Sequence, residues 1–248
     1  MNEASSNMKE HPQPYSNFAR FYDAIYETGF GGFYEELTRK TLAAIRKCSN
    51  PPDRIIDFGA GTGRLSIPLA EAGYAVTAVE PCAEMLEVLN GKIGDLPVTT
   101  NVTTLEHFDS SEPYDVALAV FTVLIHLTDE ETLRTGSRNL VGSVKPGGSV
   151  FIDISQRRAF TDQLHAPSNR FQRRIVVRAM GDDVYDYHDS GHILVGNDRK
   201  EWAENFQIRY WEPEHVKQLL RENGIDRISP IAGFETTGSE YYHCHKMD

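Results

Sequence analysis

The sequence has few cysteines, a shortage of basic residues and no long apolar run. Its three cysteines (Cys48, Cys82 and Cys244) are odd in number and widely spaced, so neither a disulfide framework nor a metal site is indicated. The 25 Lys and Arg stand against 36 Asp and Glu, a net charge of -11 that disfavours nucleic acid or an anionic membrane as partner. No segment approaches the ~20 apolar residues of a membrane span. Residues 1–14 are polar and predict a disordered lead-in without a secretory signal, and we expect a cytoplasmic protein.

Short apolar strands alternate with amphipathic helices through the first 154 residues. Strands are expected over 54–58, 74–79, 98–102, 115–121 and 149–154. Two helices are expected before the first strand. Three more are expected after it: one that ends at about residue 72, one over 83–90 and one over 129–144. Such alternation indicates βαβ units and a parallel sheet with helices on both faces.

The pattern changes between residues 155 and 211, where no helical period of any length occurs. Short β-like runs are separated by turn signals at 181–183, 190–191 and 196–198, which predicts an antiparallel insert. A helix over 213–223 and strands over 226–232 and 240–246 are expected to follow. The predicted fold is α/β: a doubly wound, mostly parallel sheet of seven strands with an antiparallel β lid after the fifth. We expect residues 15–154 and 212–248 to form one domain and residues 155–211 the inserted lid.

The glycine-rich segment Asp57-Phe58-Gly59-Ala60-Gly61-Thr62-Gly63-Arg64 follows the first strand and opens a helix. Glycine lets the backbone turn sharply and approach a ligand closely. Glu80 ends the second strand, so its carboxylate is expected beside this loop, where it can accept two hydrogen bonds from a ribose diol. A ligand that carries a ribose is therefore predicted at the carboxyl ends of the first two strands.

A nicotinamide dinucleotide fits this loop less well. The dinucleotide fingerprint is G-x-G-x-x-G, which places a pyrophosphate on a helix N-terminus. Here the glycine spacing is G-x-G-x-G, and Arg64 occupies the position of the third fingerprint glycine.

The loop and the segments that follow it resemble the class I S-adenosylmethionine-dependent methyltransferases, in particular their small-molecule branch. The stretch DFGAGTGRLSIPLAEAGYAVTAVEP is similar to the first two motifs of that family. PYDVALAVFTVLIH is similar to its fourth-strand segment, and LVGSVKPGGSVFIDI to its turn into the fifth strand. The resemblance implies a Rossmann-like fold and S-adenosyl-L-methionine as the cofactor.

The resemblance also implies roles for individual residues. The loop would hold the methionine part of the cofactor, Glu80 its ribose hydroxyls, and Phe121 would lie near the sulfonium. Many family members carry an acid near the adenine amino group, where this chain has two threonines. The implied cofactor-binding residues are Tyr15, Tyr22, Asp57, Gly59, Ala60, Gly61, Gly63, Glu80, Pro81, Met85, Thr103, Thr104, Val120 and Phe121.

Methyl transfer is an in-line displacement, for which acceptor and methyl group must be held about 3 Å apart and away from water. The reaction requires no metal, and we expect none. A phenol or carboxylate acceptor needs a positioned base, whereas an amine needs only to lose a proton. His126, just beyond the fourth strand, is the best candidate base; a capping or packing role for it stays open. His188 and His192 are weaker candidates.

Six arginines lie between residues 157 and 178 against one acid, Asp162; they are Arg157, Arg158, Arg170, Arg173, Arg174 and Arg178. They are either a grip for an acidic acceptor or partners in surface ion pairs. We predict methyl transfer to a small molecule, at nitrogen rather than oxygen, by a monomer or homodimer. The alternatives are O-methylation of a small acid or phenol, cyclisation or aminopropyl transfer from the same cofactor, and cofactor binding without turnover.

Overall fold

The computed structural model describes residues 13–110, 112–234 and 238–248. Its larger sheet has the strand order β10-β11-β5-β4-β1-β2-β3. The strands are β1 (Arg54–Phe58), β2 (Ala75–Val79), β3 (Val98–Asn101), β4 (Tyr114–Ala119), β5 (Val144–Ser155), β10 (Ile225–Pro230) and β11 (Ser239–Lys246). Strands β1 to β5 pair in parallel, and β11 runs antiparallel to both β5 and β10. The mostly parallel seven-stranded sheet expected from the sequence is confirmed.

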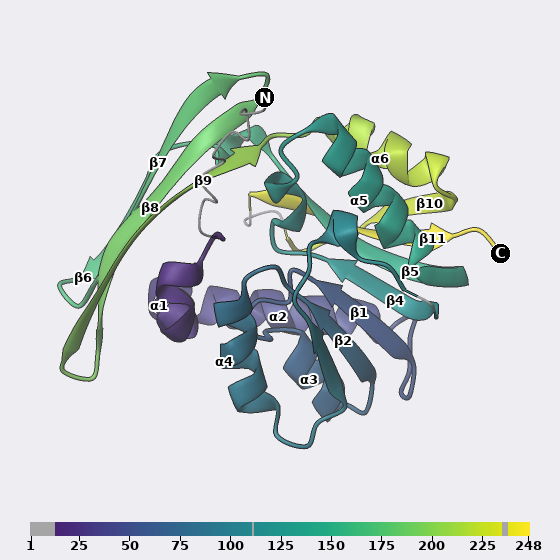
Figure 1. The fold of residues 1–248 in the computed structure, drawn as a ribbon, viewed down its shortest axis with the longest axis horizontal. Coiled ribbons are helices and arrows are strands. Elements are labelled where there is room, and N and C mark those ends of the chain that lie inside the picture. The colour runs from purple at the N-terminus through teal and green to yellow at the C-terminus, as the bar shows by residue number, and fades with distance from the viewer. Residues whose placement is uncertain (1–12, 111, 235–237) are drawn as a thin grey trace, which may run out of the picture.

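Helices cover both faces of this sheet (Figure 1). They are α2 (Gly32–Ile45), α3 (Ser66–Glu71), α4 (Ala83–Ile93), α5 (Glu130–Gly142) and α6 (Pro213–Glu222). Neighbouring strand residues point to opposite faces, and Ile55 and Ile56 of β1 are both fully buried. Ile55 packs with residues of α2 and α3, and Ile56 with residues of α5 and α6. This explains why β1 is apolar in consecutive positions. None of the described helices is long and apolar enough to cross a membrane.

The insert is a second, four-stranded antiparallel sheet in the order β6-β7-β8-β9. Its strands are β6 (Gln163–Ser168), β7 (Phe171–Gly181), β8 (Val184–Val195) and β9 (Asp198–Arg209). The N-terminal 3-10 helix η1 (Ser16–Phe21) and helix α1 (Tyr22–Phe30) lie between this sheet and the larger one (Figure 1). Their residues share a buried cluster with Phe171, Ile193 and Trp202 of the insert. The antiparallel lid is thus confirmed as an element of the fold.

Two local expectations from the sequence are wrong. Ser190-Gly191 is not a turn, because both residues lie inside the continuous strand β8. A Cβ at Gly191 would lie 2.2 Å from the Gln172 carbonyl oxygen and 2.6 Å from the Trp202 ring, so glycine serves close packing here. Strand β5 starts at Val144 and runs through the Pro-Gly-Gly segment that was expected to precede it. The predicted lead-in lies almost entirely outside the described residues.

Candidate active site

A cavity of about 560 Å³ lies between the large sheet, the N-terminal segment and the lid. Eleven of the fifteen site residues predicted from the sequence line it: Tyr15, Tyr22, Gly59, Gly61, Glu80, Pro81, Met85, Thr103, Thr104, Phe121 and His126. The other four (Asp57, Ala60, Gly63 and Val120) are not among its lining residues. The structure therefore brings most of the predicted site together, from segments up to about 110 residues apart.

The glycine loop takes a backbone path that requires glycine. Gly59, Gly61 and Gly63 have φ values of 68°, 57° and 95°, in the region that other residues rarely adopt. A Cβ at Gly59 would lie 2.5 Å from Val123, and one at Gly63 only 2.3 Å from Leu89. The missing side chain at Gly59 thus makes room for Val123 at the cavity wall, and the one at Gly63 lets the loop pack against Leu89 of α4.

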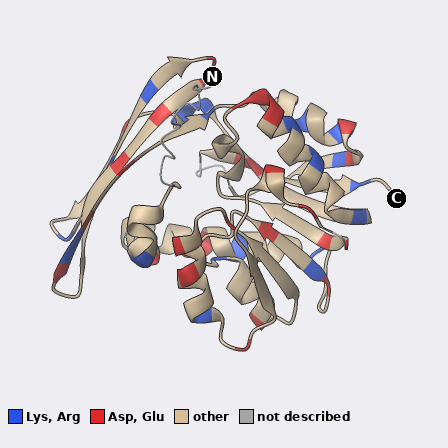
Figure 2. Cartoon of the chain, in the orientation of Figure 1, with Lys and Arg blue, Asp and Glu red and all other residues tan. Residues whose placement is uncertain are grey.

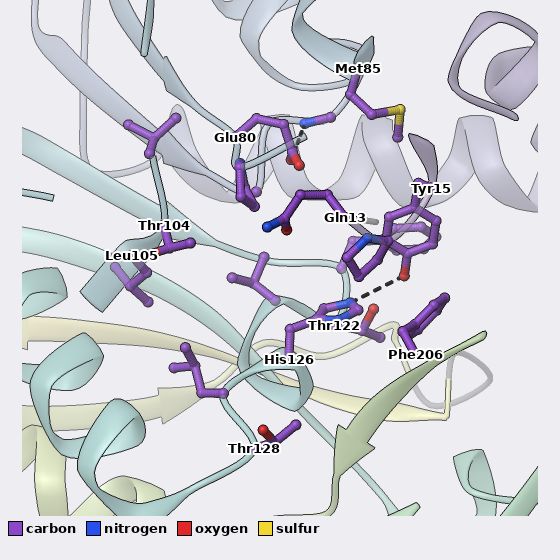
Figure 3. A pocket seen from close by; sticks show the side chains of 18 of the residues that line it. Gln13, Tyr15, Glu80, Met85, Thr104, Leu105, Thr122, His126, Thr128 and Phe206 are labelled. Carbon is purple, nitrogen blue, oxygen red and sulfur yellow. Dashed lines mark hydrogen bonds between the residues drawn. The ribbon is translucent and has the colours of Figure 1, made fainter. Parts of the chain in front are cut away.

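Glu80 follows β2 and is nearly buried, with 7% of its surface exposed. Its Oε2 accepts a hydrogen bond from the Gly61 N–H at 3.0 Å, and its Oε1 one from the Cys82 N–H at 3.0 Å. Burial raises the pKa of this carboxyl to about 7, against the lowering effect of the two N–H donors. Figure 3 shows the carboxylate among the side chains that line the cavity, and the two N–H donors fix its orientation.

Asp57, at the start of the glycine loop, bonds to the helix that follows the loop. It is buried at 3% exposure, and it accepts a hydrogen bond from the Ser66 hydroxyl at 2.6 Å. Burial raises the pKa of its carboxyl to about 6. This hydrogen bond connects the end of β1 to the start of α3.

The corner after β4 has a backbone conformation that sequence reasoning missed. Phe121 and Thr122 have φ values of 73° and 69°, uncommon for residues other than glycine. Asp153 of β5, 1% exposed, accepts the Thr122 N–H at 2.9 Å, and the Arg64 guanidinium lies 4.9 Å from the centre of the Phe121 ring. These contacts hold the corner in the wall of the cavity. An aspartate inside the apolar run SVFIDI was the available signal.

In the same cavity, the Tyr15 hydroxyl lies 3.1 Å from Nε2 of His126 (Figure 3). Burial lowers the pKa of His126 to about 4 and raises the pKa of Tyr15 well above its ordinary value. Near neutral pH the pair is therefore an uncharged imidazole beside a protonated phenol. The histidine therefore carries no positive charge there, and with this lowered pKa it is a weak base.

Aromatic rings form much of the remaining wall. Tyr22 and Tyr26 have ring centroids 4.4 Å apart, and Tyr26 meets Phe121 edge-on at 5.6 Å. Phe206 of β9 lies 5.4 Å from Tyr15. The N-terminal segment, the β4 corner and the lid each contribute to this wall.

Glu106 is a further lining residue that the sequence argument passed over. It lies in the short 3-10 helix η2 (Leu105–His107), directly after Thr103 and Thr104. Its Oε2 is buried and has no hydrogen-bond partner within the described ranges. The chain thus does carry an acid near the expected adenine position, a few residues later than the strand count suggested.

The arginines of the insert do not line the cavity; neither do His188 and His192. Arg173 is buried and bonds to Asp189 at 2.6 Å. Arg157 pairs with Asp183 and Glu212, both at 2.8 Å. For these two, the ion-pair interpretation of the cluster is the one that the contacts support.

Comparison with known proteins locates this architecture among methyltransferases. A family model described as a methyltransferase domain matches residues 55–148. An uncharacterized methyltransferase of Anoxybacillus flavithermus is 29% identical over 143 residues, 58% of this chain and 63% of that protein. A ubiquinone biosynthesis O-methyltransferase of Rickettsia typhi is 30% identical over 106 residues, 42% of each chain. The chain spans about half the length of the curated relatives it matches.

Solved structures share the fold over nearly the whole chain. An S-adenosylmethionine-dependent methyltransferase from Clostridium acetobutylicum superposes with a TM-score of 0.78, at 16% identity, over 94% of this chain and 99% of that one. An amino pentose methyltransferase from Micromonospora echinaspora, with S-adenosylmethionine bound, gives 0.74 at 17% identity, over 91% and 96%. The chain thus contains a methyltransferase domain over residues 55–148, and it has the fold of the S-adenosylmethionine-dependent methyltransferases.

Proposed function

We propose that this protein transfers the methyl group of S-adenosylmethionine to the nitrogen of a small-molecule amine. The observation that carries the proposal is one cavity that joins Glu80 and the glycine loop to the Tyr15–His126 pair. In this proposal Glu80 binds the ribose hydroxyls, and Glu106 with the two threonines receives the adenine amino group. Phe121 lies next to the sulfonium, which carries the methyl group that is transferred.

The charge of the cavity favours an amine over an acid. Of the described residues that line it, none is Lys or Arg, whereas Glu80, Glu106 and Asp186 are acidic. Aromatic faces attract cations, and Tyr15, Tyr22, Tyr26, Phe121 and Phe206 all line the cavity. An amine carries positive charge before deprotonation and after methylation, so it suits this lining, whereas an acidic acceptor meets no basic partner.

The groups of this chain would assist the reaction chiefly by holding and enclosing the acceptor. Alignment for in-line attack and exclusion of water supply most of the rate enhancement of such a displacement. The Tyr15 hydroxyl and Nε2 of His126 lie within hydrogen-bond distance, and both residues line the cavity, where they can contact the acceptor. With its pKa lowered to about 4, the imidazole is too weak a base to take a proton from an ammonium group, so the acceptor would bind as the free amine. We therefore assign His126 to contact and orient the free amine rather than to act as the base, and Tyr15 to orient the imidazole.

We propose different roles for the two sheets. The large sheet would bind the cofactor, and the lid with the N-terminal segment would select the acceptor. We also propose a cytoplasmic enzyme, because Cys48, Cys82 and Cys244 are all free thiols, which suits a reducing compartment.

Product analysis tests the proposed reaction. The protein is incubated with S-adenosylmethionine and a panel of small aliphatic amines and amino sugars, each matched to the alcohol that replaces the amine. We expect S-adenosylhomocysteine and an N-methylated product from at least one amine and none from its matched alcohol. Transfer to the alcohols would contradict the nitrogen assignment, and methylthioadenosine as product would show a different use of the cofactor.

A further inference from the structure

We propose that Glu204 is a positioning residue through which the lid fixes Tyr15 over the active site. The proposal rests on the function proposed above and extends it to the way the cavity closes. Glu204 lies on strand β9 of the lid, about 190 positions after Tyr15 in the sequence, and it does not itself line the cavity.

The contact is between one carboxylate and two backbone groups of the N-terminal segment. Oε2 of Glu204 accepts a hydrogen bond from the Tyr15 N–H, and Oε1 accepts one from the Asn17 N–H at 2.7 Å. Glu204 is 6% exposed. Hydrogen bonds to an ionised acceptor are shorter and stronger than neutral ones, so this side chain fastens the start of η1 to the lid.

Tyr15 needs such a restraint, because its backbone is in the left-handed region with φ 73°. A residue with a Cβ rarely adopts this conformation unless its surroundings impose it. The same strand that bonds the Tyr15 backbone also contacts its ring, since Phe206 lies two positions after Glu204, on the same face of β9. Backbone and ring of Tyr15 are thus both set by the lid, and its phenol meets His126 as a result.

Packing alone does not explain a carboxylate at this position. Its neighbours on the same face of β9 are Trp202 and Phe206, which belong to apolar clusters. A buried carboxylate is costly unless hydrogen bonds compensate it, whereas an apolar side chain would extend the packed surface without that cost. The two N–H donors of the N-terminal segment are the compensation, so lid and segment close the cavity as one unit.

Hydrogen exchange and cofactor-product binding test this role with Glu204→Gln. The amide of glutamine has one oxygen, so one of the two N–H donors loses its acceptor. We expect exchange at the amides of Tyr15 and Asn17 to speed by about tenfold or more, because a lost hydrogen bond exposes them to local opening. S-adenosylhomocysteine, titrated calorimetrically, should bind about tenfold more weakly, the effect of one charge-assisted hydrogen bond. Glu204→Asp, which keeps the charge but not the reach, is the second variant.

Glu201→Gln is the matched control. Glu201 lies on the opposite face of the same strand, is exposed, and pairs with Arg199. We expect its change to leave both exchange and binding within about twofold of the parent, as surface ion pairs contribute little.

A double variant separates positioning from general destabilisation. Tyr15→Ala removes the ring but keeps the N–H that Glu204 binds. If Glu204 acts through the position of this ring, Glu204→Gln should weaken binding by less than about twofold in the Tyr15→Ala background, because effects on coupled residues are not additive. Full additivity, or unchanged exchange and binding in both Glu204 variants, would overturn the proposal. If the parent protein itself failed to bind S-adenosylhomocysteine, the function proposed above would fail instead.

Discussion

Glu80 and His126 both line the cavity, and burial shifts the pKa of each toward the uncharged form. The pKa of Glu80 is raised to about 7 and that of His126 is lowered to about 4. Such paired shifts are common where groups bind or exchange protons with a ligand. The two residues therefore lead to different expectations near neutral pH: Glu80 titrates there, whereas His126 stays neutral.

The pH dependence of product binding should report Glu80. An acid with its pKa raised to about 7 is ionised above that pH and protonated below it. The carboxylate accepts two hydrogen bonds from a ribose diol, whereas the acid accepts fewer. We expect the dissociation constant of S-adenosylhomocysteine to rise by up to about tenfold between about pH 8 and pH 6, because one carboxyl with a pKa of about 7 is mostly ionised at the first pH and mostly protonated at the second. In Glu80→Gln this slope should vanish; the same slope in both proteins would assign the effect to another group.

Gly63 is expected to be the least replaceable position of the loop. Gly63→Ala combines a φ of 95° with a Cβ placed 2.3 Å from Leu89, so we expect a loss of unfolding free energy of about 2–4 kcal/mol. Gly91→Ala, in the same helix as Leu89, meets no atom within 4 Å and should gain about 0.5–1 kcal/mol. Urea unfolding of both variants measures the difference, and equal stabilities would refute the packing argument.

At the scale of elements, β4 and β5 cooperate to shape the site. Asp153 of β5 binds the Thr122 N–H just beyond the end of β4, where two consecutive residues have positive φ. The strands thus do more than form a sheet, because a buried side chain of one sets the backbone of the corner that follows the other. The inward-facing carboxylate is what permits a strained corner at the cavity wall.

Asp153→Ala should therefore relax this corner. The Thr122 N–H loses its acceptor, which costs about 1–3 kcal/mol of stability, and the moved Phe121 should weaken S-adenosylhomocysteine binding by about tenfold or more. Asp115→Asn is the control, because Asp115 lies at the far end of β4, where it bonds to the Arg54 N–H and pairs with Lys145. Calorimetry should find its binding unchanged. Weakened binding in both variants would mean that β4 acts as a whole, not through its corner.

The elements also show where sequence reasoning ends. Apolar runs predicted the strands well, because burial on one or two faces leaves a periodic signal along the chain. The glycine spacing after the first strand predicted the loop. Gly191 was misassigned to a turn, since the groups that demand glycine there, the Gln172 carbonyl and Trp202, come from neighbouring strands. Glu106 and Asp153 were missed for the same reason. Their importance lies in backbone groups and spaces that only the folded chain assembles.

On the scale of the whole molecule, the composition described the surface better than the site. Figure 2 shows Lys and Arg and Asp and Glu spread over helices and lid strands. The net charge of -11 disfavoured nucleic acid as a partner. The six arginines of the insert suggested, in contrast, that the insert binds an acidic acceptor. In the structure Arg157 and Arg173 are paired with acids away from the cavity. Charge counts along the sequence do not report which charges are already neutralised.

The central claim is that one cavity, built from both sheets and the N-terminal segment, binds S-adenosylmethionine through Glu80. Calorimetric titration with S-adenosylhomocysteine tests it most directly, comparing the parent protein with Glu80→Ala. The account predicts one site per chain in the parent. It also predicts an affinity lower by about a hundredfold or more in the variant, since two hydrogen bonds to a charged group contribute about 1.5–3 kcal/mol each. No binding by the parent, or equal binding by both proteins, would contradict it.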